Sequence, residues 1–192
     1  MTIPASDEEQ VLRLHRDWYF SNFNINIPLM RTVFATGDES FLMFNLNDHP
    51  YFGVDDLANL WSFYARTDEW GLCEDHVMRV DVSGDMAYVV SEGSFPAWRV
   101  RDEEGHELPE RIDRPAYYRS TEVYKRDDGA GNPEWKMWHF HCSTRPADDE
   151  APAAKTREDA ADRRGLGNTP YTRGTRTDYA DLLGDHHDAA TS

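Results

Sequence analysis

The spacing of apolar residues changes once along this chain, and that change limits the folds that it can adopt. Near the N-terminus, apolar side chains recur every three or four residues, as at Val11, Leu14 and Trp18. From about residue 72 to residue 144 they tend to alternate, which is the period of a strand. Helices followed by a run of hairpin-connected strands predict an α+β domain, with the helices packed on one face of an antiparallel sheet.

The boundaries of the predicted helices follow from capping residues and breakers. Ser6 followed by Glu9 has the form of a capping box, so the first helix is predicted to begin there and to run to about residue 24. Pro28 suits the first turn of a second, short helix, which Gly37 closes. A third helix is predicted where apolar side chains again share one face, at Leu57, Leu60, Trp61 and Tyr64.

Strands are predicted over residues 40–47, 72–82, 86–101, 116–126 and 134–144. The first is followed by turn chemistry in "DHPYFG", at residues 48–53. Residues 83–85 and 127–133 are predicted hairpin turns, and residues 102–115 form a longer charged excursion. After residue 145 apolar periodicity is almost lost, so the chain divides into a domain of residues 1–145 and a polar extension or arm of residues 146–192.

Charge and composition restrict the possible partners. A formal net charge of -16 argues against nucleic acid or an anionic membrane as a partner and favours a small aromatic or apolar ligand. The sequence has no run of apolar residues long enough to cross a bilayer and no export signal at its start, which predicts a cytoplasmic protein. Its two cysteines, Cys73 and Cys142, are expected to be reduced and buried.

The last predicted strand, in "EWKMWHFHCSTRP", carries two histidines among aromatic residues. Strict alternation places Trp135, Met137, His139, His141 and Ser143 on one face and Trp138, Phe140 and Cys142 on the other. Both faces carry large apolar groups. We therefore expect one face to pack on the helices and the other on a second subunit, giving a homo-oligomer, either a dimer or a trimer.

The order of elements and the closing "PEWKMWHFHCS" resemble the SnoaL-like branch of the nuclear transport factor 2-like (NTF2-like) superfamily over about residues 7–144. "TEVYKRDDG" and "WKMWHFHCS" are especially similar to the last two strands of the association domain of calcium/calmodulin-dependent kinase. The resemblance implies a cone formed by a curved antiparallel sheet wrapped around N-terminal helices. Glu122 stands where the association domains commonly have an arginine, which argues against an anion-binding hub.

The superfamily contains ketosteroid isomerases, polyketide cyclases, dehydratases and lyases, together with inert oligomerising modules. A similarity to lyases that deformylate lignin-derived diarylpropanes without a cofactor is a further resemblance. It implies a cofactor-independent acid-base enzyme, most readily a lyase or dehydratase that cleaves a C–C or C–O bond of a small aromatic hydroxylated compound. The alternative is a non-catalytic ligand-binding or association module, and a cavity without convergent titratable groups would favour it.

The resemblance places several ionisable residues near the mouth or floor of the cone. The candidate catalytic residues are His49, His141, Glu92 and Glu122. Burial among apolar strand residues raises the pKa of a carboxylic acid towards neutrality, as a general acid or base requires. The alternatives are that both glutamates face solvent or pair with Arg119 or Arg99, that residues 48–50 form only a turn, and that the histidines are structural.

Most of the many aromatic residues are expected to form the core, and a subset is expected to line a pocket for a flat ligand. The candidate substrate-binding residues are Trp18, Tyr19, Tyr51, Trp61, Tyr118 and His139. His139 and His141 with His49 or His76 offer three imidazoles, but no spacing fixes the third ligand. The sequence therefore predicts no metal and no cofactor.

Overall fold

The computed structural model describes residues 5–37, 40–47, 49–144 and 176–178. Three α-helices form near the N-terminus, α1 (Asp7–Asn22), α2 (Ile27–Val33) and α3 (Gly53–Thr67), with a 3-10 turn, η1 (Phe23–Ile25), after the first. The predicted capping box is present: the Ser6 hydroxyl accepts a hydrogen bond from the Glu9 amide, and the Glu9 carboxylate accepts one from the Ser6 amide. All three predicted helices are therefore confirmed.

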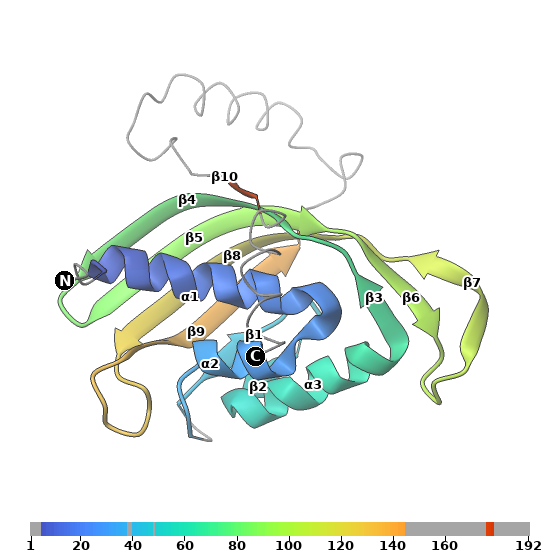
Figure 1. The fold of residues 1–192 in the computed structure, drawn as a ribbon, viewed down its shortest axis with the longest axis horizontal. Coiled ribbons are helices and arrows are strands. Elements are labelled where there is room, and N and C mark those ends of the chain that lie inside the picture. The colour runs from blue at the N-terminus through green and yellow to red at the C-terminus, as the bar shows by residue number, and fades with distance from the viewer. Residues whose placement is uncertain (1–4, 38–39, 48, 145–175, 179–192) are drawn as a thin grey trace, which may run out of the picture.

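The strands form two sheets (Figure 1). The larger has the order β10-β4-β5-β8-β9-β1-β2 and the smaller has the order β3-β6-β7. All pairs are antiparallel except β1 with β9, which is parallel. The strand bounds are β1 (Leu42–Phe44), β2 (Pro50–Phe52), β3 (Asp68–Trp70), β4 (Glu74–Ser83), β5 (Met86–Phe95), β6 (Ala97–Arg101), β7 (Glu107–Asp113), β8 (Ala116–Arg126), β9 (Trp135–Thr144) and β10 (Arg176–Asp178).

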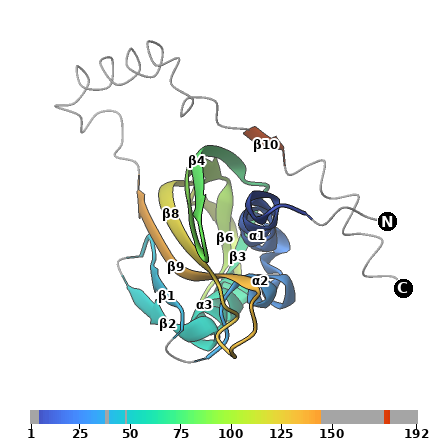
Figure 2. The same ribbon diagram turned by 90° about the vertical axis from the view of Figure 1, so that its left-hand side faces the viewer.

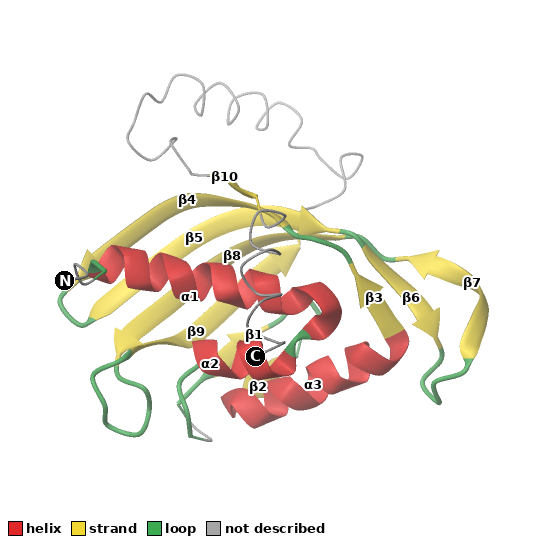
Figure 3. Ribbon diagram, viewed as in Figure 1, coloured by secondary structure: helices red, strands yellow, loops and turns green. Residues whose placement is uncertain are grey.

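The larger sheet curves around the helices, and α1 lies along its concave face (Figure 3). The view in Figure 2 shows α1 and α2 on one side of this sheet, and no described helix covers the other side. Trp18 of α1 is buried between Phe34, Trp61 and Phe140, which come from three different parts of the chain. The α+β class and the cone-shaped sheet around N-terminal helices are confirmed.

The strand prediction missed β3, which directly follows α3, and it is wrong in three further details. The strand predicted over residues 86–101 is broken at Pro96, which has no amide hydrogen to continue the ladder, so that β6 belongs to the smaller sheet. The predicted excursion over residues 102–115 contains β7, an edge strand paired with β6. The predicted turn over residues 48–53 contains β2, where Pro50 is tolerated because β2 is an edge strand.

Strict alternation also fails along β9. The register shifts between Val123 and Tyr124, which pair with His139 and Met137, so Trp138 is an extra residue on β9. This bulge brings Trp135 and Met137 to the same buried side as Phe140 and Cys142. His139, His141 and Ser143 lie on the outer face, and the last two are exposed. The prediction that His139 and His141 share a face with Trp135 and Met137 is therefore wrong.

Most of the predicted extension, residues 146–192, lies outside the described residues. Its described part, β10, pairs antiparallel with β4, with Arg176 opposite His76 and Asp178 opposite Glu74. Cys73 and Cys142 are both buried and free, as expected. Among the helices that the structure describes, none has the length and apolar character needed to cross a membrane.

Candidate active site

A buried histidine between two carboxylates lies at the centre of the cone. His15 comes from α1, where helical spacing places it on the same inward side as Val11, Trp18 and Tyr19. Its Nε2 is 2.8 Å from Oδ2 of Asp75 on β4, and its Nδ1 is 2.9 Å from Oε2 of Glu122 on β8. All three side chains have 0% exposure. Only the imidazolium form can donate both hydrogen bonds at once.

The charge of the two carboxylates determines the protonation of this histidine. Burial by itself lowers the pKa of His15, but the negative charges of Glu122 and Asp75, with their hydrogen bonds, outweigh it and raise the pKa to about 10. His15 is thus held as a cation between two acids at neutral pH. The sequence did not single out His15 or Asp75 as functional, although an ionisable residue within an apolar helical face was a visible signal.

Two tyrosines of β8 extend this cluster by donating hydrogen bonds to its carboxylates. Tyr118 donates a hydrogen bond of 2.7 Å to Oδ1 of Asp75, and Tyr124 donates one of 2.6 Å to Oε2 of Glu122. The Cys73 sulfur lies 3.0 Å from the Tyr118 hydroxyl. Burial is the main cause that raises the pKa of Tyr118 well above its usual value, and nearby ionisable groups raise it further. Tyr118 therefore remains a neutral phenol.

A glycine makes the bond between Tyr118 and Asp75 possible. Gly93 on β5 is the register partner of both Asp75 on β4 and Tyr118 on β8. A Cβ atom at Gly93 would lie 2.6 Å from the Tyr118 hydroxyl and 2.1 Å from the backbone oxygen of Glu74. The phenol of Tyr118 therefore crosses β5 through the space left by the missing side chain.

A cavity of about 290 Å³ lies next to this cluster, between the helices and the sheets. Tyr19 and Tyr118 line it with their rings stacked at 5.1 Å, and they separate it from His15, Asp75 and Glu122, which do not line it. The residues that line it are Trp18, Tyr19, Asn22, Asn45, Leu46, Asn47, Trp61, Tyr64, Asp68, Trp70, Phe95, Ala97, Arg114, Ala116, Tyr118, Phe140 and Cys142.

One carboxylate lines the cavity itself. Asp68, at the end of α3, is buried, and its Oδ2 accepts hydrogen bonds from the Thr67 hydroxyl and, at 3.4 Å, from Nη2 of Arg99. The sequence prediction did not include Asp68. Its sequence position, at the end of a helix, gives no sign that it lines a cavity, because the cavity forms only when α3 packs near β6.

Four of the six predicted substrate-binding residues, Trp18, Tyr19, Trp61 and Tyr118, line the cavity. Tyr51 does not: its half-buried hydroxyl accepts a hydrogen bond of 2.7 Å from Asn47, which does line it. His139 lies on the outer face of β9 and donates a 2.9 Å hydrogen bond to the Leu42 carbonyl.

The predicted catalytic residues are divided among three places. Glu122 belongs to the buried cluster. His49 and His141 line a separate pocket of about 360 Å³ with Phe44, whose ring lies 5.7 Å from that of His141. Glu92 lines a third pocket with His76 and accepts a 3.3 Å hydrogen bond from Arg119, the alternative partner that the sequence suggested.

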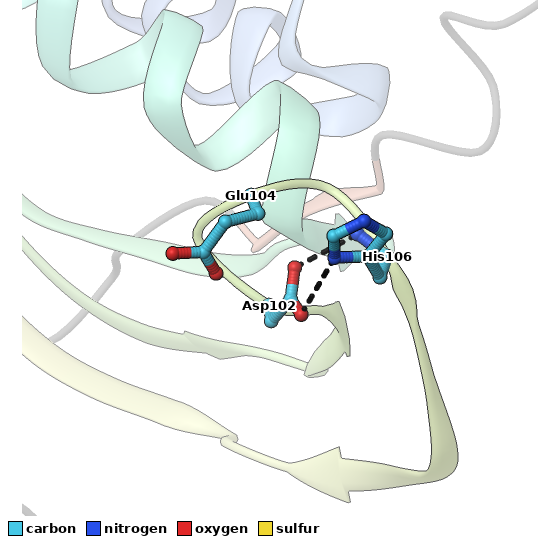
Figure 4. A group of neighbouring side chains, drawn as sticks. All are labelled: Asp102, Glu104 and His106. Atoms are coloured by element: carbon cyan, nitrogen blue, oxygen red, sulfur yellow. Dashed lines mark hydrogen bonds and ion pairs between the residues drawn. The ribbon is translucent and has the colours of Figure 1, made fainter.

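Within the described residues, one group of three side chains has ligand atoms close enough together to hold a metal ion (Figure 4). Asp102, Glu104 and His106 lie in the turn between β6 and β7, and none of them lines the aromatic cavity. The His106 amide and ring both bond to Asp102, at 2.8 and 3.2 Å. These hydrogen bonds stabilise the turn, which is a sufficient reason for Asp102 and His106 to lie close together.

No model of a known protein family matches the chain, and no curated protein matches it in sequence. Solved structures do match. A protein from Streptomyces avermitilis assigned as a dehydratase of the NTF2-like family is 19% identical, with a TM-score of 0.57, over 75% of this chain and 100% of its own. The chain has the NTF2-like fold. The resemblance to this superfamily is confirmed at the level of the fold.

Other structures with this fold differ in what they do. A hexachlorocyclohexane dehydrochlorinase is 14% identical, with a TM-score of 0.55, over 71% of this chain and 84% of its own. A protein from Thiobacillus denitrificans assigned as a calcium/calmodulin-dependent protein kinase type II association domain is 15% identical, with a TM-score of 0.53, over 76% of this chain and 100% of its own. The fold therefore accommodates both enzymes and association domains. Only the geometry and chemistry of the site can distinguish these two kinds of function.

Proposed function

We propose that this protein is a cofactor-independent acid-base enzyme, a lyase or dehydratase that cleaves a C–C or C–O bond of a small aromatic hydroxylated compound held in the aromatic cavity. The observation that carries the proposal is the hydrogen-bonded chain from Tyr118, in the cavity wall, through Asp75 to His15. Withdrawing charged groups from water costs several kcal/mol per ion, so such a cluster beside a cavity favours a functional role over a purely structural one.

In this proposal Tyr118 acts as the acid. Its hydroxyl gives a proton to the oxygen that leaves in an elimination or to the carbanion that C–C cleavage releases, and it is reprotonated through Asp75 from the His15 imidazolium. Glu122 and Tyr124 hold the other side of the imidazole and fix its orientation. Tyr19, stacked on Tyr118 and bonded to Ser120 at 2.9 Å, is the second phenol that faces the bound compound.

Asp68 is the base in this proposal because it is the carboxylate that lines the cavity. It would take the proton whose loss starts the cleavage, from a carbon in an elimination or from a hydroxyl in a C–C cleavage. The rings of Trp18, Trp61 and Phe140 supply the flat apolar surfaces on which an aromatic compound packs.

The test is a screen of hydroxylated aromatic compounds for elimination or C–C cleavage, followed by variants assayed on the best substrate. Tyr118→Phe and Asp68→Asn are expected to lower turnover about a hundredfold or more, the usual worth of a positioned acid or base. Tyr117→Phe is the matched control, since Tyr117 is the neighbouring exposed tyrosine and does not line the cavity. Full turnover in both site variants would contradict the proposal.

The same assay decides the competing hypothesis from the sequence, in which one of His49, His141 or Glu92 takes the proton and a second holds or returns one, with a histidine as the first choice for the base. If His49→Ala or His141→Ala lowers turnover a hundredfold in a folded protein while Asp68→Asn does not, the chemistry takes place in the outer pocket that these histidines line.

A second candidate function is a non-catalytic ligand-binding or association module. Two observations favour it: His15, Asp75 and Glu122 do not line the cavity, and association domains share the fold. This candidate predicts that aromatic compounds bind without any conversion, and that Tyr118→Phe changes stability alone.

A further inference from the structure

The charges around the aromatic cavity do not balance. Its lining includes one cation, Arg114, and one carboxylate, Asp68. Asp68 already forms an ion pair with Arg99. Within the part of the chain that the structure describes, the Arg114 side chain has no hydrogen bond or ion pair to another side chain. The cavity thus has an unpaired positive charge in its wall.

The backbone of Arg114 is held in place beside the cavity. Its amide donates a 2.7 Å hydrogen bond to the carbonyl oxygen of Ala97, and Pro115, which follows it, restricts its conformation. Ala97 and Ala116 line the cavity next to it, and their small side chains leave room for a guanidinium. Arg114 is exposed, so a ligand in the cavity can reach its guanidinium from the solvent side.

A cation in the cavity wall matters because the molecule as a whole is acidic. The chain has 36 acidic and 20 basic residues, and its overall field repels anions. An anionic ligand therefore needs a local positive group where it binds. A guanidinium supplies that charge and also presents paired N–H groups that match the two oxygens of a carboxylate.

We propose that Arg114 binds the carboxylate of an aromatic carboxylic acid whose single ring packs in the cavity against Trp18, Trp61 and Tyr118. The size of the cavity, about 290 Å³, is near the lower end of the range for ligand sites, roughly 300–1,000 Å³, and suits one ring with a short side chain. The inference rests on the site proposed above and names its substrate class, but it concerns binding and requires no catalysis.

The test is a binding measurement with a matched pair of probes, 3-(4-hydroxyphenyl)propanoate and its primary amide. Trp18, Trp61 and Trp70 line the cavity, so binding is followed by tryptophan fluorescence and checked by calorimetry. The acid is expected to bind severalfold tighter than the amide, roughly two- to fivefold, which is the usual worth of an ion pair to an exposed cation. Added salt should weaken binding of the acid and leave the amide unchanged.

Variants assign this preference to one residue. Arg114→Gln should bind the acid and the amide equally, and Arg114→Lys should keep part of the preference because it retains the charge without the paired N–H groups. Arg111→Gln, on β7, removes one positive charge from a residue that does not line the cavity and should behave as the wild type.

Three outcomes would overturn the inference: equal binding of acid and amide to the wild type, a preference that survives Arg114→Gln, or no binding of either probe. These outcomes are distinct from failure of the proposed enzyme. An acid that binds through Arg114 but is never converted supports this inference and contradicts the function. Conversion of neutral aromatics that is unaffected by Arg114→Gln does the reverse.

Discussion

His15 depends on the fold more than other ionisable residues do, because its ring is buried and the charged groups that compensate for its lost hydration are Asp75 and Glu122. A buried cation between two buried anions keeps its geometry only while all three partners remain charged or share their protons. This dependence makes the stability of the cluster sensitive to pH, over a range set by the pKa of His15 in the folded protein.

The stability that His15 contributes is expected to decline on the alkaline side of neutrality. Its pKa in the folded protein is raised to about 10, above the value near 6.5 of an unfolded chain. Its contribution is therefore complete below about pH 6.5 and is lost as the pH rises through the folded pKa. Denaturant unfolding of wild type and His15→Gln between pH 6 and 10 checks this, with the difference between them expected to shrink as the pH rises.

Because His15→Gln could itself prevent folding, NMR titration of the His15 ring nitrogens in the wild type provides a second measurement. A ring that titrates near 6.5 would show that the two carboxylates do not hold the proton.

Gly93 should be intolerant of the smallest side chain. In Gly93→Ala the added methyl would lie 2.1 Å from the Glu74 backbone oxygen and 2.6 Å from the phenol oxygen, so it would displace both β4 and Tyr118 and break the bond between Tyr118 and Asp75. The His15 ring resonances should then shift as they do in Tyr118→Phe, and turnover should fall with them. Ser94→Ala, at the next position of the same strand, is the control. Unchanged His15 resonances in Gly93→Ala would contradict the positioning role of this glycine.

At the scale of elements, local signals predicted the helices better than the site. Ser6 and Glu9 mark the start of α1 through bonds within one turn, so the sequence alone was sufficient. The strand breaks depend on pairing: β2 and β7 were missed because they are edge strands whose partners lie elsewhere in the chain. The spacing of apolar residues within a segment does not reveal which distant strand that segment pairs with.

The β9 bulge explains why strict alternation placed the histidines of this strand on the same face as Trp135 and Met137. One extra residue, Trp138, exchanges the faces of the strand, so that the residues after it no longer follow the alternation of those before it. Glu122 needed no such correction, and it is the predicted acid that enters the buried cluster. Asp68 and Asp75 join the site only through packing of α3 and of α1 against the sheets, which no local pattern reveals.

For the molecule as a whole, we predict a homo-oligomer that packs through the outer face of the larger sheet. No described helix covers that face (Figure 2), and Phe44 and Tyr117, which line the pockets of His141 and Glu92, are 44% and 51% exposed. Light scattering should report a multiple of 22.2 kDa, and Phe44→Glu should lower it. Ile112→Glu, at an exposed apolar residue on β7 of the smaller sheet, is the control. A compact 22.2 kDa wild-type monomer would exclude this assembly.

The chain beyond residue 145 is also predicted to stabilise the domain. Its described strand, β10, pairs with β4, which without it would be an open edge of the larger sheet with unpaired backbone groups. The paired β4 residues include Asp75, so loss of β10 removes backbone hydrogen bonds from the strand that holds His15. Truncation after residue 145 should therefore lower the melting temperature and loosen the cluster, which would appear as faster exchange of the β4 amide hydrogens.

The matched control for this prediction is truncation after Tyr179, which keeps β10 and removes the residues that follow it. If β10 is the stabilising segment, the longer protein should melt like the full chain and the shorter one should melt earlier. Equal melting temperatures for the full chain and for the truncation after residue 145 would show that the pairing of β10 with β4 adds nothing to stability. A fall in both truncated proteins would place the stabilising contact after residue 179.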